Sequence, residues 1–575
     1  MKVFFSATLH SCRRASHALL YGLLILLTAA CVAVPVTGPV PAQGKISDID
    51  QLFNWVTPEM PGCAVAVAQN GEVVVNRAYG LANLEHALPI TPNTVFDIGS
   101  VQKQFVAAAI LILVEDGQLT LSDDIRTYFP ELPDYGHTIT IDHLLTHTSG
   151  IRDWTALIQL SHEREDALTM ILRQRGLNFT PGEEWAYSNS GYVLLKELIR
   201  RTTGMSFSAF AQARLFGPLG METTIYADDV RDVEERALAY EPKGNSWQLN
   251  ILVGNERGDG SGLLSTASDL LLWNEALTNA RLGAFVTEKL QEPARLNNGR
   301  ELSYARGLFL DESPASRIIW HGGSAAAYKS LLARLPEQGL SFAILCNAGD
   351  GTEEQNLANQ IIDLFTSDTS EPNAEPTESA TGPTATNDVD PTPAADPNSR
   401  AGLFFSEGTG EPLRLVVQNG KLRVDNGPEL LPVTQDRYRN EQRTLTFMSD
   451  AQVKVHFLSP NEIEITTAEG ETIRYHRAQN YVPTVTALEA FVGRYESNEL
   501  NAVLDIALAD DGLTISLNGS PPFPFTPADR NTFQLGRMLV RFRQDEGAKV
   551  VALAYSNPVL RNVHFTRLGD AMESP

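Results

Sequence analysis

Residues 366–400 constrain the fold of this chain more than any other segment, because they cannot form part of a packed core. The segment consists mostly of Pro, Thr, Ser, Ala and Asp, and it contains seven acidic residues against one basic residue. Such a composition is typical of a disordered, extended linker. We therefore expect separately folded regions on either side of it, and 575 residues suffice for three or four domains.

The region 44–365 contains a serine followed by a base at helical spacing. Lys103 lies three residues after Ser100, and an unbroken apolar run extends from Phe105 to Val114. The run is too short to cross a bilayer and predicts a helix buried on all sides. Such a helix would place Ser100 and Lys103 on one face, and burial would lower the pKa of the lysine. A neutral amine can accept the serine proton during nucleophilic attack.

Two further motifs follow in order along the chain. Tyr-Ser-Asn occupies 187–189 ahead of a predicted helix, and His-Gly-Gly occupies 321–323 at the end of a predicted strand. Each motif is weak alone, since a second Tyr-Ser-Asn at 555–557 has no partner motif nearby and is interpreted as coincidence. His147 lies in a Thr-His-Thr-Ser-Gly run, for which we favour a structural role in a loop.

The order, separation and local sequence of these motifs resemble the serine β-lactamase and penicillin-binding-protein superfamily. The similarity is to the branch that holds class C β-lactamases, DD-peptidases, D-aminopeptidases and related esterases, and it covers about residues 50–365. The segments that carry it are 96–103, 144–150, 187–192, 262–270 and 321–323.

The resemblance implies a role for each matching residue. Ser100 would be the acylated nucleophile and Lys103 its base partner. Tyr187 would relay a proton to the leaving group and assist the deacylating water, and Asn189 would bind the amide carbonyl of the substrate. Which of Lys103 and Tyr187 takes the first proton stays open.

The third motif departs from the Lys-Thr-Gly of true β-lactamases. His321 is mostly neutral at pH 7 and would offer a substrate a hydrogen bond in place of a permanent cation, so efficient β-lactam hydrolysis is not expected. Gly323 would let a ligand backbone approach closely. The backbone N–H groups of Ser100 and Ser324 would form the oxyanion hole.

Strand patterns occur at both ends of the region 44–365, with helical patterns between them. The predicted strands are 63–68 and 73–75, joined by an Asn-Gly turn, and 317–320, 329–335 and 340–346. One antiparallel sheet built from both ends, with a helical region between, is a β-lactamase-like α/β sandwich. It would place the third motif on an edge-facing strand beside the helix that carries the nucleophile.

Cys63 and Cys346 lie on two strands that the resemblance implies to be neighbours. We expect two buried free thiols, since a cross-strand bridge strains a sheet, although an oxidising compartment would permit a disulfide. The sequence has no zinc-type cluster of cysteine or histidine, so we predict no metal and no cofactor.

Residues 401–480 and 487–575 are predicted to be two copies of one small all-β, barrel-like domain. Four features recur at similar offsets. The pairs are Gly402 with Gly493, Asn419-Gly420 with Asp511-Gly512, Thr446-Phe447 with Arg541-Phe542, and Arg477 with Arg567. We assign no ligand to these domains.

Residues 1–43 read as a signal peptide or N-terminal anchor, with basic residues before an apolar run. We expect export to the periplasm or beyond, with the N-terminus available for membrane attachment; lipidation at Cys31 is only weakly indicated. Without residues 1–43, which carry three positive charges and no acidic residue, the net charge of −25 becomes −28. Such acidity argues against nucleic-acid binding.

Three functions from different classes fit these observations. The favoured one is an exported serine hydrolase that acts through a Ser100 acyl-enzyme on D-amino-acid-containing peptides, amides or related esters. The second is a carboxylesterase with the same residues, and the third is a penicillin-binding cell-wall sensor that is acylated without turnover. Intact Tyr187 and Asn189 weigh against the third. The partner is therefore a small peptide, amide or ester, and the natural substrate, chirality preference and oligomeric state stay open.

Overall fold

The structure is a computed structural model that describes most of the chain from residue 43 onward. It describes residues 43–575 except 163–164, 227–232, 234–235, 251–261, 313–315, 367–395, 408–409, 426–428, 440–453, 467–471, 480, 510–511, 558 and 570–575. The predicted leader and most of the predicted linker lie outside the described residues. The two ends of the predicted linker are helical, since α11 (Glu354–Thr366) ends at Thr366 and α12 spans Pro397–Arg400.

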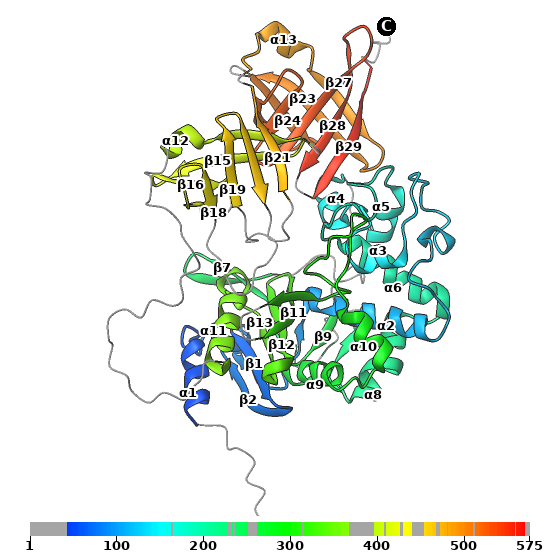
Figure 1. Cartoon of the computed structure of the whole chain (residues 1–575), viewed down its shortest axis with the longest axis vertical. Helices are drawn as coiled ribbons and strands as arrows, with labels where there is room; N and C mark the ends of the chain where they lie inside the picture. The colour runs from blue at the N-terminus through cyan, green and yellow to red at the C-terminus, as the bar shows by residue number, and fades with distance from the viewer. Residues whose placement is uncertain are drawn as a thin grey trace, which may run out of the picture. The chain divides into compact units, whose positions relative to one another are not determined.

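A six-stranded antiparallel sheet forms the centre of the region before the linker (Figure 1). Its order is β10-β11-β12-β13-β1-β2, so both ends of the region contribute strands, as predicted. The strands are β1 (Cys63–Gln69), β2 (Glu72–Tyr79), β10 (Phe309–Glu312), β11 (Arg317–Ala325), β12 (Tyr328–Leu335) and β13 (Leu340–Cys346).

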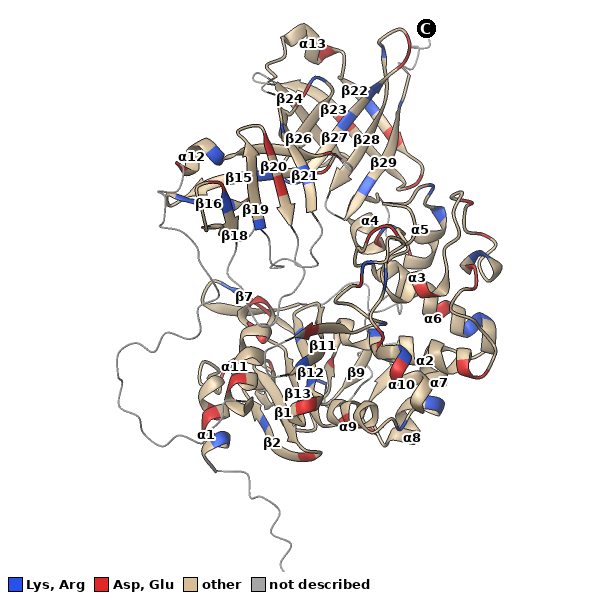
Figure 2. Ribbon diagram, in the orientation of Figure 1, with Lys and Arg blue, Asp and Glu red and all other residues tan. Residues whose placement is uncertain are grey.

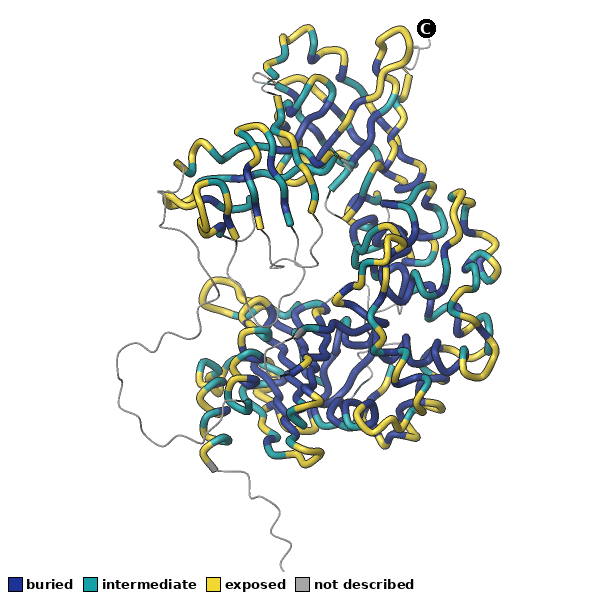
Figure 3. Tube along the Cα trace, viewed as in Figure 1, coloured by how far each residue is buried: buried dark blue, intermediate teal, exposed yellow. Residues whose placement is uncertain are grey.

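The sheet is buried on both faces because β1 and β13 are apolar at every position except Gln69 and Ser341. β1 and β13 contain no charged residue (Figure 2) and are drawn almost wholly as buried tube in Figure 3. In β1, Val65 packs on one face with α1 (Gln43–Leu52) and α11, and Ala66 packs on the other face with the helical region. The alternation follows from the two-residue period of a strand.

The helical region lies between the two groups of strands in the sequence. Its helices are α2 (Lys103–Glu115), α3 (Ile141–Leu145), α4 (Trp154–Leu160), α5 (Ala167–Arg173), α6 (Asn189–Thr203), α7 (Phe207–Ala211), α8 (Gly217–Leu219), α9 (Ala267–Thr278) and α10 (Ala284–Gln291). α2 is the predicted buried helix, with every residue from Lys103 to Leu113 buried. Gly117, which follows the helix, has a φ of +72°.

The third motif lies in β11, which is not the edge strand of the sheet. The edge is β10, a four-residue strand that the sequence analysis missed. β10 pairs only with Arg317–Trp320, so residues 321–325 extend beyond it. The prediction of an edge strand is therefore wrong for β11 as a whole, but this end of β11 lacks a neighbour in β10 and packs beside Gly99 instead.

Cys63 and Cys346 form a disulfide, so the expectation of free thiols is wrong. The two residues are direct partners in the antiparallel pairing of β1 with β13, and their Cα atoms are 4.1 Å apart. This separation is typical of a narrow antiparallel pair, in which both side chains point to the same face of the sheet. The pairing register therefore places both sulfur atoms on the same face of the sheet, where they are bonded.

Two eight-stranded antiparallel domains follow the linker, the second a closed barrel. The first contains β14 (Gly402–Ser406), β15 (Pro412–Gln418), β16 (Lys421–Val424), β17 (Leu431–Pro432), β18 (Arg437–Arg439), β19 (Lys454–Ser459), β20 (Glu462–Thr466) and β21 (Thr472–Arg477). The barrel contains β22 (Gly493–Ser497), β23 (Ala502–Ala509), β24 (Gly512–Leu517), β25 (Phe523–Pro527), β26 (Thr532–Leu535), β27 (Met538–Gln544), β28 (Val550–Asn557) and β29 (Leu560–Arg567).

The two domains share an equivalent contact at their last strands, and the duplication stays a prediction. Arg477 ends β21 and lies 4.5 Å from the ring of Phe404, and Arg567 ends β29 and lies 6.0 Å from the ring of Tyr495. The predicted match of residues 446–447 with β27 falls outside the described residues. By strand order the counterpart of β27 is β19.

Among the described residues, none of the helices is both long and apolar enough to span a membrane. Within the same residues, no group of three or more His, Cys, Asp or Glu side chains is arranged to hold a metal ion.

Candidate active site

Ser100 and Lys103 lie at the junction of a short helix and α2. Ser100 belongs to the 3-10 helix η1 (Gly99–Gln102), and Lys103 is the first residue of α2. The Lys103 amine donates a hydrogen bond to Ser100 Oγ at 3.0 Å. The predicted pair is therefore in contact, within a tighter turn than the α-helix expected from the spacing. Ser100 remains partly exposed while Lys103 is only 3% exposed, so the hydroxyl is accessible and the base is not.

The environment of Lys103 favours a neutral amine. Burial lowers the pKa of Lys103 to about 7; nearby Asp153 opposes this shift, and Lys196 adds to it. About half of the molecules would then carry an uncharged amine at pH 7. This fraction is large enough for Lys103 to act as a proton acceptor at neutral pH.

Asn189 joins Lys103 to an aspartate that the sequence analysis did not identify. The Asn189 Oδ1 accepts a hydrogen bond from Lys103 Nζ at 2.9 Å. Its side-chain amide and its backbone N–H both donate to Asp153 Oδ2, at 3.0 and 2.8 Å. These bonds fix the orientation of the amide and leave its second N–H for a substrate carbonyl. Binding of that carbonyl by Asn189 stays a prediction.

Tyr187 places a buried hydroxyl next to this pair. Its oxygen lies beside the Ser100 hydroxyl, and its ring centroid lies 4.7 Å from Lys103 Nζ. Burial raises the pKa of the Tyr187 phenol above its usual value, and the adjacent Ser100 hydroxyl opposes the shift. Tyr187 is therefore a protonated phenol at neutral pH.

His321 is fully buried and neutral. Burial, with a smaller effect of Lys103, lowers the pKa of His321 to about 3. Its Nδ1 lies 2.5 Å from the Gly322 carbonyl oxygen, and its Nε2 lies 3.4 Å from the Tyr304 hydroxyl. The absence of a permanent cation at this position agrees with the sequence analysis. Both ring nitrogens face protein atoms, and contact of His321 with substrate stays a prediction.

His147 packs against the ring of Tyr187 and binds the neighbouring backbone. These contacts agree with the structural role favoured from the sequence. Its Nδ1 accepts a hydrogen bond from the Ser188 N–H at 3.1 Å, and its ring centroid lies 4.3 Å from that of Tyr187. The bond to Ser188 leaves the proton on Nε2, which lies 3.1 Å from the Tyr304 hydroxyl. Tyr304 thus connects His147 to His321, and nothing in the local sequence around Tyr304 indicates this.

Two glycines allow β11 to approach η1. A Cβ atom on Gly323 would lie 2.1 Å from the Ile98 carbonyl oxygen, and one on Gly99, whose φ is +51°, would lie 2.8 Å from the Ser324 backbone nitrogen. Side chains larger than hydrogen would separate the two segments. The close approach puts the Ser324 N–H beside the turn that carries Ser100, as a shared oxyanion hole requires.

The predicted residues thus gather at one place, from segments more than two hundred residues apart. Ser100, Lys103, Tyr187 and Asn189 contact one another, and Gly323 brings Ser324 to the same turn. Asp153 was missed. The only local signal for it is an N-cap position before α4, where its side chain accepts a hydrogen bond from the Thr155 N–H, and this does not reveal its contact with Asn189.

Comparison with known proteins places this site in a family. The chain is 31% identical over 316 residues to penicillin-binding protein 4* of Bacillus subtilis (strain 168). This alignment covers 50% of this chain and 68% of the relative. It is 24% identical over 539 residues to a D-aminopeptidase of Brucella canis, covering 88% of this chain and 96% of the relative. The crystal structure of SurE aligns with a TM-score of 0.50 at 19% identity, covering 76% of this chain and 98% of that one, which supports the fold alone. A family model described as beta-lactamase matches residues 50–366, more than half of the sequence, and the chain therefore belongs to the β-lactamase family of hydrolases.

Proposed function

We propose that this protein is an exported serine hydrolase that cleaves D-amino-acid-containing peptides, amides or related esters through an acyl-enzyme on Ser100. One observation carries the proposal. The Lys103 amine lies 3.0 Å from Ser100 Oγ, and burial lowers the pKa of Lys103 to about 7. A hydroxyl and a partly neutral amine in contact form an activated nucleophile.

In the proposed acylation, Ser100 Oγ attacks the substrate carbonyl while Lys103 accepts the hydroxyl proton. The backbone N–H groups of Ser100 and Ser324 stabilise the oxyanion. Tyr187 gives its proton to the leaving amine or alkoxide, and the proton on Lys103 then restores the phenol. A water molecule reverses these transfers and releases the acid product. Burial lowers the pKa of Lys103 and raises that of Tyr187, so at neutral pH the amine is partly deprotonated and the phenol is not. This difference supports Lys103 as the first base.

Two observations support the proposed class of substrate. His321 is neutral because burial lowers its pKa to about 3, so it cannot attract a substrate carboxylate. The Brucella canis relative named D-aminopeptidase matches 88% of this chain, well beyond the 50–366 range. We therefore favour release of an N-terminal D-residue, or cleavage of an amide or ester, over carboxypeptidase and efficient β-lactamase activity.

Export is proposed from the leader sequence. The Cys63–Cys346 disulfide supports it, because structural disulfides persist mainly in oxidising compartments such as the periplasm. Membrane attachment through the N-terminus stays a prediction, as the leader lies outside the described residues.

A substrate panel with active-site variants tests the proposed function. The panel contains D- and L-alanine p-nitroanilide, p-nitrophenyl butyrate and a chromogenic cephalosporin. We expect turnover of the D-anilide, with Ser100→Ala and Lys103→Ala each reduced by at least ~10³-fold. Tyr555→Phe is the matched control, because it alters the second Tyr-Ser-Asn in β28 and should retain activity.

Each alternative outcome is distinct. Turnover of the butyrate ester without any D-anilide would favour a carboxylesterase. A stable penicilloyl adduct on Ser100 with no product release would favour a penicillin-binding sensor. Activity that survives Ser100→Ala would refute the assignment of the nucleophile.

A further inference from the structure

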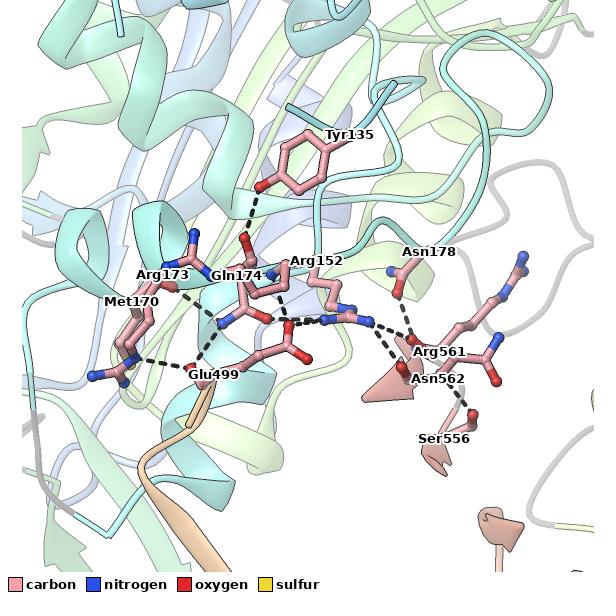
Figure 4. A network of polar contacts seen from close by, with 11 residues as sticks. Tyr135, Arg152, Met170, Arg173, Gln174, Asn178, Glu499, Ser556, Arg561 and Asn562 are labelled. Atoms are coloured by element: carbon pink, nitrogen blue, oxygen red, sulfur yellow. Dashed lines mark hydrogen bonds and ion pairs between the residues drawn. The ribbon is translucent and has the colours of Figure 1, made fainter. Parts of the chain in front are cut away.

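Arg152, which precedes Asp153 in the chain, is bound by the C-terminal barrel. Its side chain is only 2% exposed although it carries a charge. The Arg152 guanidinium donates to Glu499 Oε2 at 2.7 Å and to the backbone carbonyls of Arg561 and Asn562, each at 3.0 Å (Figure 4). These three partners belong to the barrel formed by β22 to β29, and a fourth, Gln174 Oε1 at 3.2 Å, belongs to the region before the linker. The barrel therefore supplies the counter-charge of a buried cation next to the candidate active site.

Residues of the region before the linker also bind the turn that carries Glu499. The Glu499 carboxylate accepts a hydrogen bond from the Arg175 N–H at 2.8 Å. Its backbone carbonyl accepts hydrogen bonds from Arg173 Nε at 2.9 Å and from Gln174 Nε2 at 3.2 Å (Figure 4). Glu499 is 7% exposed, so these contacts are shielded from water. A carboxylate with several buried donors has little freedom to move.

Helix α4, which begins directly after Asp153, packs on the same barrel. Leu157 and Leu160 belong to the apolar core cluster of the barrel, together with Leu500. Asn518 in the barrel donates a hydrogen bond to the Leu160 carbonyl at 3.0 Å. Both ends of α4 are thus held by residues that follow the linker, the N-terminal end through Arg152 and the C-terminal end through Leu160.

The same segment is hydrogen-bonded to α6, which carries Asn189. The Ser190 hydroxyl donates to the Arg152 carbonyl at 2.7 Å and accepts from the Trp154 N–H at 2.9 Å. The backbone is therefore fixed on both sides of Asp153, with its Oδ2 directed at Asn189. A shift of Arg152 would move this carboxylate.

We propose that the barrel is a positioning element of the active site, in which Glu499 and Arg152 hold Asp153 so that Asp153 orients Asn189 and Lys103. The proposal rests on the proposed function of Ser100. Glu499, Arg152 and Asp153 are positioning residues, because they act through Asn189 and have no direct contact with Ser100 in the described structure.

The proposal is tested by the rate at which a fluorophosphonate labels Ser100 in the full chain. Labelling forms a P–O bond to Ser100, expels fluoride and transfers the hydroxyl proton to Lys103, so it requires the base but no particular substrate. We expect Glu499→Gln to slow labelling at least tenfold. We also expect its pH midpoint to fall, as in Asp153→Asn, because Asp153 raises the pKa of Lys103 and its displacement removes that effect.

The other titratable groups around the Lys103 amine should not produce this shift. They are Tyr187, Tyr192, Lys196, His147 and His321. None of these is changed in either variant. A merely structural loss would reduce the amount of active protein without moving the midpoint.

A double-mutant cycle and a control separate coupling from unfolding. If Glu499 acts through Asp153, the double variant should label no more slowly than Asp153→Asn alone, whereas independent effects would multiply. Glu411→Gln is the matched control, since it removes a carboxylate that Arg561 contacts at 2.6 Å but leaves the Arg152–Glu499 pair intact. The fold of each variant is checked by thermal unfolding. A further variant, Arg152→Met with Glu499→Leu, removes the buried ion pair but keeps the junction filled with side chains of similar size.

The outcomes distinguish the proposal from the function on which it rests. Wild-type labelling with an unchanged rate and midpoint in folded Glu499→Gln would overturn the positioning role and leave the nucleophile assignment standing. Multiplicative effects in the cycle would overturn it as well. Failure of the wild-type protein to label at Ser100 would refute the proposed function, and the inference with it.

Discussion

The buried amine of Lys103 predicts an acid limb in the pH profile of activity. Burial lowers its pKa to about 7, so the uncharged fraction is about one half at pH 7 and about 1% at pH 5. If Lys103 is the base, kcat/KM should fall about 50-fold between pH 7 and pH 5. Burial holds the pKa of His147 and of His321 below their usual range and that of Tyr187 above it. These groups should add no further inflection between pH 6 and 9.

Lys196 provides a perturbation that tests this reasoning without touching the reacting atoms. Its positive charge lowers the pKa of Lys103, and its amine donates to the Tyr226 hydroxyl at 3.0 Å. In Lys196→Met the neighbouring charge is lost, so the pKa of Lys103 should rise and the acid limb should move to higher pH. Lys289→Met is the control, because Lys289 pairs with Glu292 at 2.8 Å and does not act on Lys103.

The assay is kcat/KM for the best substrate of the panel from pH 5 to pH 9.5 at constant ionic strength. A limb that is still rising at pH 9.5 would show that Lys103 is not sufficiently desolvated to act as the base. A midpoint that falls in Lys196→Met, or moves equally in Lys289→Met, would refute the electrostatic account. An unchanged profile in Lys103→Ala would assign the limb to another group.

Three further predictions concern stability and close packing. Lys103→Met should stabilise the protein below pH 7 by at most about 5 kcal/mol, since the fall in the pKa of Lys103 from 10.5 to about 7 reflects the cost of burying the ammonium. The gain should vanish as pH rises towards 10.5, and urea unfolding at pH 6 and 9.5 measures it. Reduction of the Cys63–Cys346 disulfide, with a sequence separation of 283, should cost up to about 5–6 kcal/mol, read from urea midpoints with and without dithiothreitol. Gly323→Ala should lower kcat at least ~100-fold, because its Cβ would lie 2.1 Å from the Ile98 carbonyl oxygen; wild-type kcat in a folded variant would contradict this.

The parts of the site that follow from local spacing could be predicted from the sequence. The contact of Ser100 with Lys103 depends on one turn of backbone, and the apolar run after it determines that the base is buried. The strands at 63–68 and 340–346 were identifiable from β-branched and apolar residues bounded by turns. Their pairing came from the resemblance, because periodicity does not show which strands are neighbours.

The parts that depend on distant segments could not be predicted. The disulfide required the register that makes Cys63 and Cys346 direct partners, and a one-residue shift would have pointed the side chains to opposite faces. β10 was missed because a four-residue strand has too few positions to show alternation. Asp153 looks like any helix N-cap until the fold brings Asn189 to it.

The pKa of Lys103 depends on two opposing effects, the burial of the amine and the negative charge of Asp153. Burial alone would lower it further, which would make the amine available but a weaker base, and a general base is most effective when its pKa lies near the working pH. Asp153 opposes burial and keeps the pKa near neutrality. Since the segment carrying Asp153 is held by Glu499 of the barrel, a domain that follows the linker contributes to the proton affinity of a base encoded almost four hundred residues earlier. Glu499→Gln should therefore alter the pH at which the enzyme works, and not only its stability.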